Sequence, residues 1–421
     1  MTYRTKLPNG IRVVGEEIQS LRSVSIGVWV KTGSRYETKR DNGVSHFLEH
    51  MFFKGTDRYS AMELAQVFDD LGGQVNAFTS KEYTCFYARV LDEHFSIAID
   101  TLANMLLSSA FEAVEMEKEK RVVIEEIRMY EDTPDELVMD MLAAGIYRDH
   151  PLGYTILGQE ENLQAFTPND LRQYISEQYQ PQNIVVAIAG HIDEDTAISE
   201  VERLFGGMSN RAGADERRIE TPPFYQALMR REKDIEQVHL CLSSAGFPAG
   251  SHDLYPLILL NNVLGGTQSS RLFQEIREEQ GMAYSVYSFH TAYQDAGMFG
   301  IYAGTSPDHV EPVLASILQI CEGFVTEQLT DAELTKAKQQ VKGAMMLGLE
   351  SSGSRMSRLA KNELLLGRDI PVEETLAGIE RVTLSEIQRI AGQLFRDGFS
   401  LSAVGPIEGI NFAAYVSEQS V

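Results

Sequence analysis

The sequence predicts an α+β protein in which one α/β sandwich, an antiparallel-rich sheet with helices packed on one face, occurs twice in the chain. Three observations support this prediction. Strand-like and helix-like segments are interleaved, a helix followed by a buried strand recurs at a fixed distance, and 421 residues exceed the length that one hydrophobic core usually serves. We expect a first domain at residues 1–209, a linker at 210–225 and a homologous second domain at 226–421.

The elements expected in the first half follow from turn and capping residues. Pro8-Asn9-Gly10 joins two strand-like runs, which is typical of a hairpin. Ser60 and Glu63 form a capping box at the start of a helix that ends at Gly72-Gly73. The other expected elements are a strand at 25–30, an apolar helix at 43–53, paired strands at 74–79 and 83–90, and long helices from about 94 to 148.

The repeat is visible in the last part of each half. Thr167-Pro168-Asn169-Asp170 caps a helix, and residues 183–190 follow as a buried strand. Thr383-Leu384-Ser385-Glu386 and residues 399–405 repeat this order 216 positions later. Between the halves lies a polar segment that contains proline, which indicates a linker between two domains of about 200 residues each.

Composition excludes several classes of function. The formal net charge is −24, which argues against nucleic acid or an anionic membrane as a partner. This acidity either favours cationic substrates or merely keeps the protein soluble. Three widely separated cysteines do not make a disulfide framework, and no stretch is apolar enough for a signal peptide or a membrane span. We expect a cytoplasmic protein, and a processed organellar protein whose presequence has been removed is the alternative.

The most specific motif is H-x-x-E-H, formed by His46, Glu49 and His50. On a helix the two histidines stand one turn apart on a single face, so both imidazoles can bind one ion while Glu49 flanks it. This is H-E-x-x-H reversed, and a catalytic zinc site of this kind needs a third protein ligand from elsewhere. Such a pair also occurs by chance on solvated helices. The surrounding apolar residues favour a metal site, because a buried polar group without a partner costs about 1–3 kcal/mol.

The second half serves as an internal control for the motif. Aligning the halves on Gly55-Thr56 and Gly266-Thr267 places Leu257, Leu260 and Asn261 where the first half has the motif residues. The second half therefore lacks these ligands although it retains the apolar helix. This difference favours a chemical role for the motif over an architectural one.

Candidates for the third ligand lie on an acidic helical segment at 115–127. Glu119 and Glu126 are seven residues apart and share a helix face, whereas Glu125 is turned about 100° away. A solvated acidic face is the alternative explanation of this pattern. The corresponding helix of the second half, from Leu334 to Leu349, contains no carboxylate.

These features together resemble the pitrilysin and mitochondrial processing peptidase family, which includes insulin-degrading enzyme. The resemblance covers both halves: the segment from His46 to Thr56, the strand Asn76-Ala77-Phe78-Thr79-Ser80, Glu119 with Glu126, and Arg277 with Tyr284. It implies that His46, His50 and Glu126 bind one zinc ion per chain, that Glu49 is the catalytic base, and that Glu119 supports the site.

The resemblance also implies roles in substrate binding. Arg277 and Tyr284 are expected to reach the substrate, with a structural salt bridge and a core tyrosine as the alternative. An edge strand containing Asn76 and Ala77 is expected to pair with an extended peptide, unless the strand is central. Phe53 is expected to line a pocket beyond the scissile bond, unless it is plain core. Glu136 and Asp140 resemble an acidic pair that binds arginine near the cleavage point, and a solvated helix face is the alternative.

The sequence therefore predicts a zinc endopeptidase that cleaves unfolded peptides or presequence-like segments, with a possible preference for basic residues. The alternatives are a non-catalytic subunit of a processing-peptidase-like complex and a metal-dependent hydrolase of non-peptide substrates. By the resemblance, two such chains form a four-domain chamber. A homodimer is expected, and a heterodimer fits the sequence equally well.

Overall fold

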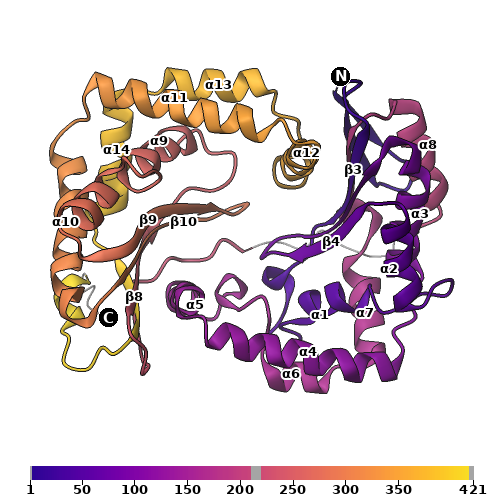
Figure 1. The fold of residues 1–421 in the computed structure, drawn as a ribbon, viewed down its shortest axis with the longest axis horizontal. Helices are drawn as coiled ribbons and strands as arrows, with labels where there is room; N and C mark the ends of the chain where they lie inside the picture. The colour runs from indigo at the N-terminus through magenta and orange to yellow at the C-terminus, as the bar shows by residue number, and fades with distance from the viewer. Residues whose placement is uncertain (1, 210–219, 417–421) are drawn as a thin grey trace. The chain divides into compact units, whose positions relative to one another are not determined.

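The computed structural model describes residues 2–209 and 220–416, and their contacts divide the chain into two compact units (Figure 1). The first unit comprises Met1–Arg128, Tyr154–Ile219 and Gly348–Asp369, and the second comprises Met129–Gly153, Glu220–Leu347 and Ile370–Val421. Each half of the chain thus contributes one segment to the unit built mainly from the other half.

The first unit is built on a six-stranded sheet with the order β1-β2-β6-β3-β5-β4. The β2–β6 pair is parallel, and the other neighbours are antiparallel. Strand β4, which includes Asn76 and Ala77, lies at an edge of the sheet, so the expectation of an edge strand is confirmed and the central alternative is wrong. The strands are β1 (Thr2–Lys6), β2 (Arg12–Glu17), β3 (Ser23–Val30), β4 (Gln74–Thr79), β5 (Thr84–Leu91) and β6 (Ile184–Gly190).

Most helices of the first unit share one large core with this sheet. Phe47, Leu102 and Leu171, from three different helices, are buried there against strand residues such as Val28 and Phe86. The capping boxes expected at Ser60 and Thr167 are both present. The helices are α1 (Val44–Met51), α2 (Ala61–Asp70), α3 (Phe95–Leu107), α4 (Ala113–Glu131, which continues into the second unit), α6 (Glu160–Ala165), α7 (Pro168–Gln178) and α8 (Glu194–Phe205).

The opposite face of this sheet is covered by α12 (Ser352–Leu366), a helix from the C-terminal half of the chain (Figure 1). Met356 and Leu359 of α12 are buried against Trp29 and Val185 of the strands. Glu363 of α12, itself buried, forms an ion pair with Arg4. The prediction placed helices on one face only, and it did not anticipate this second cover. Strand β6 is buried along its whole length because both faces are covered.

The second unit repeats the plan around a five-stranded sheet with the order β7-β11-β8-β10-β9. Here the extra cover is α5 (Pro134–Tyr147), a helix from the N-terminal half, whose Val138 and Ile146 are buried against Cys241 and Val404. The strands are β7 (Leu228–Glu232), β8 (Val238–Ala245), β9 (Ala283–Ala292), β10 (Gly297–Thr305) and β11 (Ser400–Gly405); the main helices are α9 (Leu254–Leu264), α10 (Val310–Thr326), α11 (Asp331–Gly348), α13 (Val372–Arg381) and α14 (Leu384–Phe395).

Because α5 and α12 each belong to the unit built mainly from the other half of the chain, the two units differ from the predicted domains at 1–209 and 226–421. A boundary drawn from the repeat and the polar linker cannot show the exchange, because both helices lie in the interior of a half. Residues 210–219 of the expected linker lie outside the described residues. Among the helices that are described, none has the length and apolar character needed to cross a membrane.

Candidate metal centre

The H-x-x-E-H motif lies on α1, a short apolar helix. Gly43 precedes the helix with a φ of 99°, a left-handed conformation that suits glycine. His46 and His50 follow one turn apart, with ring centroids 4.7 Å from each other. Because Phe47, Leu48 and Met51 are buried in the core, the helix has a fixed orientation that presents both rings on one side.

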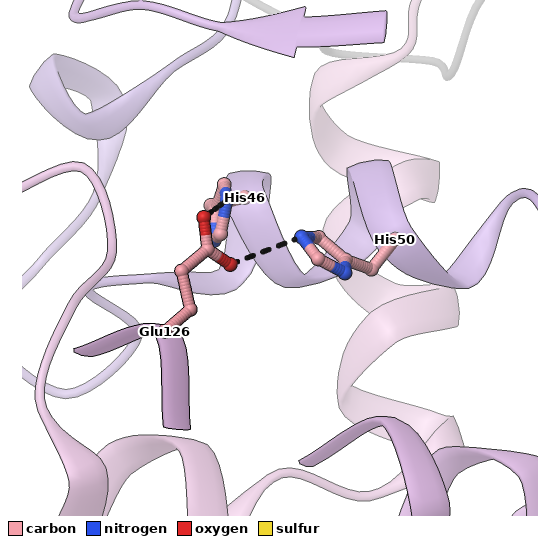
Figure 2. Close-up of side chains that lie close together, drawn as sticks. All are labelled: His46, His50 and Glu126. Atoms are coloured by element: carbon pink, nitrogen blue, oxygen red, sulfur yellow. Dashed lines mark ion pairs between the residues drawn. The ribbon is translucent and has the colours of Figure 1, made fainter. Parts of the chain in front are cut away.

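Glu126 of α4 completes a cluster of three donors (Figure 2). Its carboxylate oxygens lie 3.7 Å from Nε2 of His46 and 3.4 Å from Nε2 of His50. One donor atom from each residue lies within 4.8 Å of the other two, and no second group of this kind occurs among the described residues. Two imidazoles and one carboxylate are a donor set found in catalytic zinc sites, so the residues present fit zinc.

Glu119 supports the cluster from the other side of His50. Its carboxylate lies 2.8 Å from Nδ1 of His50 and 2.6 Å from Nζ of Lys54. A carboxylate on the second ring nitrogen fixes the orientation of a histidine ligand and leaves Nε2 for the metal. Nδ1 of His46, in contrast, is buried and has no hydrogen-bond partner among the described residues.

The two imidazoles titrate differently in the metal-free protein. Burial and the neighbouring His50 lower the pKa of His46 to about 4, although Glu126 opposes this shift. Burial also disfavours charge on His50, but the hydrogen bonds to Glu119 and Glu126 outweigh it and raise its pKa to about 9. The hydrogen bond to His50 in turn lowers the pKa of Glu126. The carboxylates therefore surround His50 with negative charge, which also favours a bound cation.

Glu49 lies beside the three donors but is not one of them. Its carboxylate accepts a hydrogen bond from the hydroxyl of Thr79 on β4, at 2.6 Å. Burial raises the pKa of Glu49, and the Thr79 hydrogen bond only partly offsets this effect. A carboxylate with a raised pKa is better suited to accept and return a proton than one at its ordinary value.

Sequence reasoning missed the residue that holds the start of α1. Glu37 is buried, and its carboxylate accepts hydrogen bonds from the backbone amides of Gly43 and Ser45 and from the side chain of Asn42, at 2.8–2.9 Å. It thus satisfies amides that the helix leaves without internal partners. The one available indication was that glycine, rather than a capping side chain, precedes the motif helix.

Comparison with known proteins identifies the family. Residues 12–160 match a model described as insulinase, peptidase family M16, and residues 165–341 match one described as the peptidase M16 inactive domain. An uncharacterized zinc protease of Bacillus subtilis is 48% identical over 406 residues, which cover 96% of this chain and 98% of the relative. The chain belongs to peptidase family M16.

Other family members support the assignment. An uncharacterized zinc protease of Streptomyces coelicolor is 37% identical over 96% of this chain and 90% of its own length. The crystal structure of a protease from Helicobacter pylori superposes with a TM-score of 0.90, at 25% identity, over 96% of this chain and 99% of that one. The M16 relatives named zinc proteases support zinc as the metal and peptide hydrolysis as the family's activity.

The M16 inactive-domain match begins after all three donors, in agreement with the absence of a metal cluster from the described part of the second half. Arg277 and Tyr284 lie there, in the second unit. The guanidinium of Arg277 stacks on the rings of Tyr284 and Phe273, with its Cζ 4.9 Å and 4.6 Å from their centroids. Tyr284 is 76% exposed, so the alternative of a core tyrosine is wrong. Arg277 lies within a π-helical turn, Phe273–Glu279, a type of turn that is frequent at functional sites.

The remaining predicted site residues differ in their surroundings. Asn76 is exposed on β4, and Ala77 beside it is buried in the core of the first unit. Phe53, just after α1, is half-buried and packs against that core. Glu136 and Asp140 lie on α5, which belongs to the second unit, whereas the metal cluster lies in the first.

Proposed function

We propose that the chain is a zinc-dependent endopeptidase that cleaves extended peptides. The observation that carries this proposal is the convergence of His46, His50 and Glu126 to within 4.8 Å, with Glu49 buried next to them and outside the donor set. A purely structural zinc site needs no additional acid and usually has four protein ligands.

The proposed mechanism assigns each group a separate task. His46, His50 and Glu126 would hold the zinc ion, which when bound supplies Lewis-acid activation of a water molecule and of the scissile carbonyl. Glu49 accepts the proton of the attacking water on its carboxylate and returns it to the leaving amine. Thr79 orients that carboxylate through its hydroxyl, and Glu119 orients the ring of His50.

Substrate binding is proposed to use the open edge of β4. An extended peptide can add to this edge as a further strand, so that backbone hydrogen bonds hold it regardless of its sequence. Thr79, the last residue of β4, binds Glu49, and therefore a peptide on this edge lies close to the catalytic acid. This arrangement favours unfolded segments, because a folded protein does not offer a free strand.

Replacing Glu49 tests the proposed mechanism most directly. The Glu49→Gln protein should retain about one zinc ion per chain, since Glu49 is not a donor, and should lose at least about a hundredfold in kcat/KM because it lacks the proton acceptor. Zinc content by elemental analysis and hydrolysis of quenched fluorescent peptides measure the two effects. A chelator should abolish the peptidase activity of the unmodified protein, and added zinc should restore that activity. Full activity of the Glu49→Gln protein would refute the proposal. An unmodified protein that binds zinc and hydrolyses no peptide would also refute it, and would favour the non-catalytic alternative.

A preference for basic residues is a finer part of the proposal. The family resemblance of Glu136 and Asp140 supports it, as do their carboxylates four residues apart on α5. Peptides with arginine near the cleavage point should then be cleaved faster than those with glutamine, and Glu136→Gln should reduce the difference. Equal cleavage of both peptide sets would remove this preference and leave the peptidase proposal intact.

The resemblance further supports a homodimer as the active form. Light scattering of the purified chain should then give twice the mass of one 47.1 kDa chain, with activity present in the absence of any other protein. An inactive monomer that gains activity from a second, different chain would support the heterodimer instead.

A further inference from the structure

A groove on the first unit, between the edge of the sheet and α12, has no place in the mechanism above. Its volume is about 650 Å³. Phe78 of β4 and Tyr87 of β5 form its aromatic side, and residues of α12, among them Ser357, Arg358 and Lys361, form the other. All of these residues lie within the first unit, so the groove is a feature of that unit alone.

Two basic side chains line the groove, in a protein with a net charge of −24. Arg358 and Lys361 line it, and none of the described lining residues has a carboxylate. Lys361 is exposed, its Nζ lies 5.8 Å from the centroid of the Tyr83 ring, and it forms no ion pair within the described residues. Hydroxyls such as that of Ser357 add further hydrogen-bond donors. An anionic group is therefore the chemical complement of this groove.

The position of the groove follows from the alternation of side chains along β4. Val75 and Ala77 pack into the core that includes α1, and Thr79 binds Glu49 of α1. Phe78 packs on the opposite face, with Trp29 and the residues of α12. Successive strand residues point to opposite faces, so the groove and Glu49 lie on opposite sides of the sheet at the same end of β4.

A peptide added to this edge continues the alternation. A residue paired with Thr79 places its side chain on the face of Glu49, and the adjacent residue, paired with Phe78, places its side chain on the face of the groove. From this geometry we propose that the groove is a specificity subsite for an acidic side chain, aspartate or glutamate, located one residue from the substrate residue that faces Glu49. This inference rests on the proposed peptidase function and on strand addition at β4.

The test compares pairs of quenched peptides that differ only by glutamate or glutamine, with the substituted position moved along the peptide. At one position the glutamate peptide should have a kcat/KM about fivefold higher, as expected for an ion pair of about 1 kcal/mol. The preference should shrink as salt is added, because the groove is open to solvent. Adjacent positions should show little preference, since their side chains point to the other face.

Variants of Lys361 link the preference to the groove. Lys361→Gln should abolish the glutamate preference, and Lys361→Glu should replace it with a preference for lysine at the same position. The readout is the ratio of kcat/KM for the glutamate peptide to kcat/KM for the glutamine peptide, because a general change in rate affects both peptides and cancels in this ratio. Lys6→Glu is the matched control: Lys6 is an exposed lysine on β1, at the other edge of the same sheet, and this variant should keep the preference.

The outcomes separate the two proposals. Cleavage that ignores acidic residues at every position, or a preference that survives in Lys361→Gln, would overturn the groove as a subsite while the peptidase function stands. A zinc-loaded protein that cleaves none of the peptides would overturn the peptidase function and this inference with it.

Discussion

The two units have the same scaffold but different chemistry. Helix α1 of the first unit presents His46, Glu49 and His50, whereas α9 of the second has Leu257, Leu260 and Asn261 at the positions predicted to be equivalent. Helix α4 contributes Glu126, whereas α11 has no carboxylate from Leu334 onward. Both apolar helices are nevertheless buried in comparable cores.

The second unit forms its core around an apolar helix without the polar residues of α1. Leu257 and Leu260 are buried in the second core and stabilise it by removing apolar surface from water. His46 is also buried, yet within the described part of the chain its Nδ1 has no hydrogen-bond partner, and a buried polar atom without a partner costs free energy. A polar residue kept at a buried position at a cost in stability is expected where it has a function, and the proposed metal site is such a function.

The largest effect is expected when α1 receives the residues of α9. The triple variant His46→Leu, Glu49→Leu and His50→Asn should fold with a melting temperature at least equal to that of the metal-free unmodified protein, bind no zinc and have only background activity. Circular dichroism and elemental analysis measure these properties. The reverse exchange in α9 is the control: it should gain no zinc, because α11 has no carboxylate from Leu334 onward to act as a third ligand. A triple variant that fails to fold would show that the polar residues are architectural.

A smaller effect is expected from the support of His50. Glu119→Gln removes the negative charge between His50 and Lys54 and should weaken zinc binding about 10- to 100-fold, while saturating zinc restores much of the activity. Competition with a chromogenic chelator measures this affinity. Glu125→Gln is the matched control, because Glu125 is exposed on the same helix and pairs with Arg128 instead. Equal affinities in the two variants would mean that Glu119 does not act on the metal site.

The smallest effect concerns the contribution of the second unit. Tyr284→Phe removes a phenol hydroxyl that can donate to the substrate, and kcat should fall about tenfold, the effect of about 1.4 kcal/mol. Zinc content and melting temperature should not change, since the side chain is 76% exposed. Tyr287→Phe, on the same strand but packed against Tyr302, should leave kcat unchanged. Unchanged kcat in Tyr284→Phe would confine the chemistry to the first unit.

Features that depend on local geometry could be predicted from the residues alone. The spacing of His46 and His50 places them on one helix face in any context, and the capping boxes at Ser60, Thr167 and Thr383 all form as expected. Helical periodicity also placed Glu119 and Glu126 on one face of the acidic helix and Glu125 on another. In the structure Glu125 is exposed and forms an ion pair with Arg128. The strands around the hairpin at Pro8-Asn9-Gly10 were predicted for the same reason.

Other features arise only when distant segments pack together. The approach of Glu126 to the histidines, the hydrogen bond of Thr79 to Glu49 and the support of α1 by Glu37 each join separate elements. The exchange of α5 and α12 between the units depends on which sheet faces remain uncovered once the sheets have formed. The edge position of β4 depends on the order in which the strands pair. Backbone geometry fixes the relative positions of residues that are a few positions apart in the chain. The pairing of distant segments is determined by the burial of apolar surface, and the pattern within one segment does not indicate which other segment will cover it.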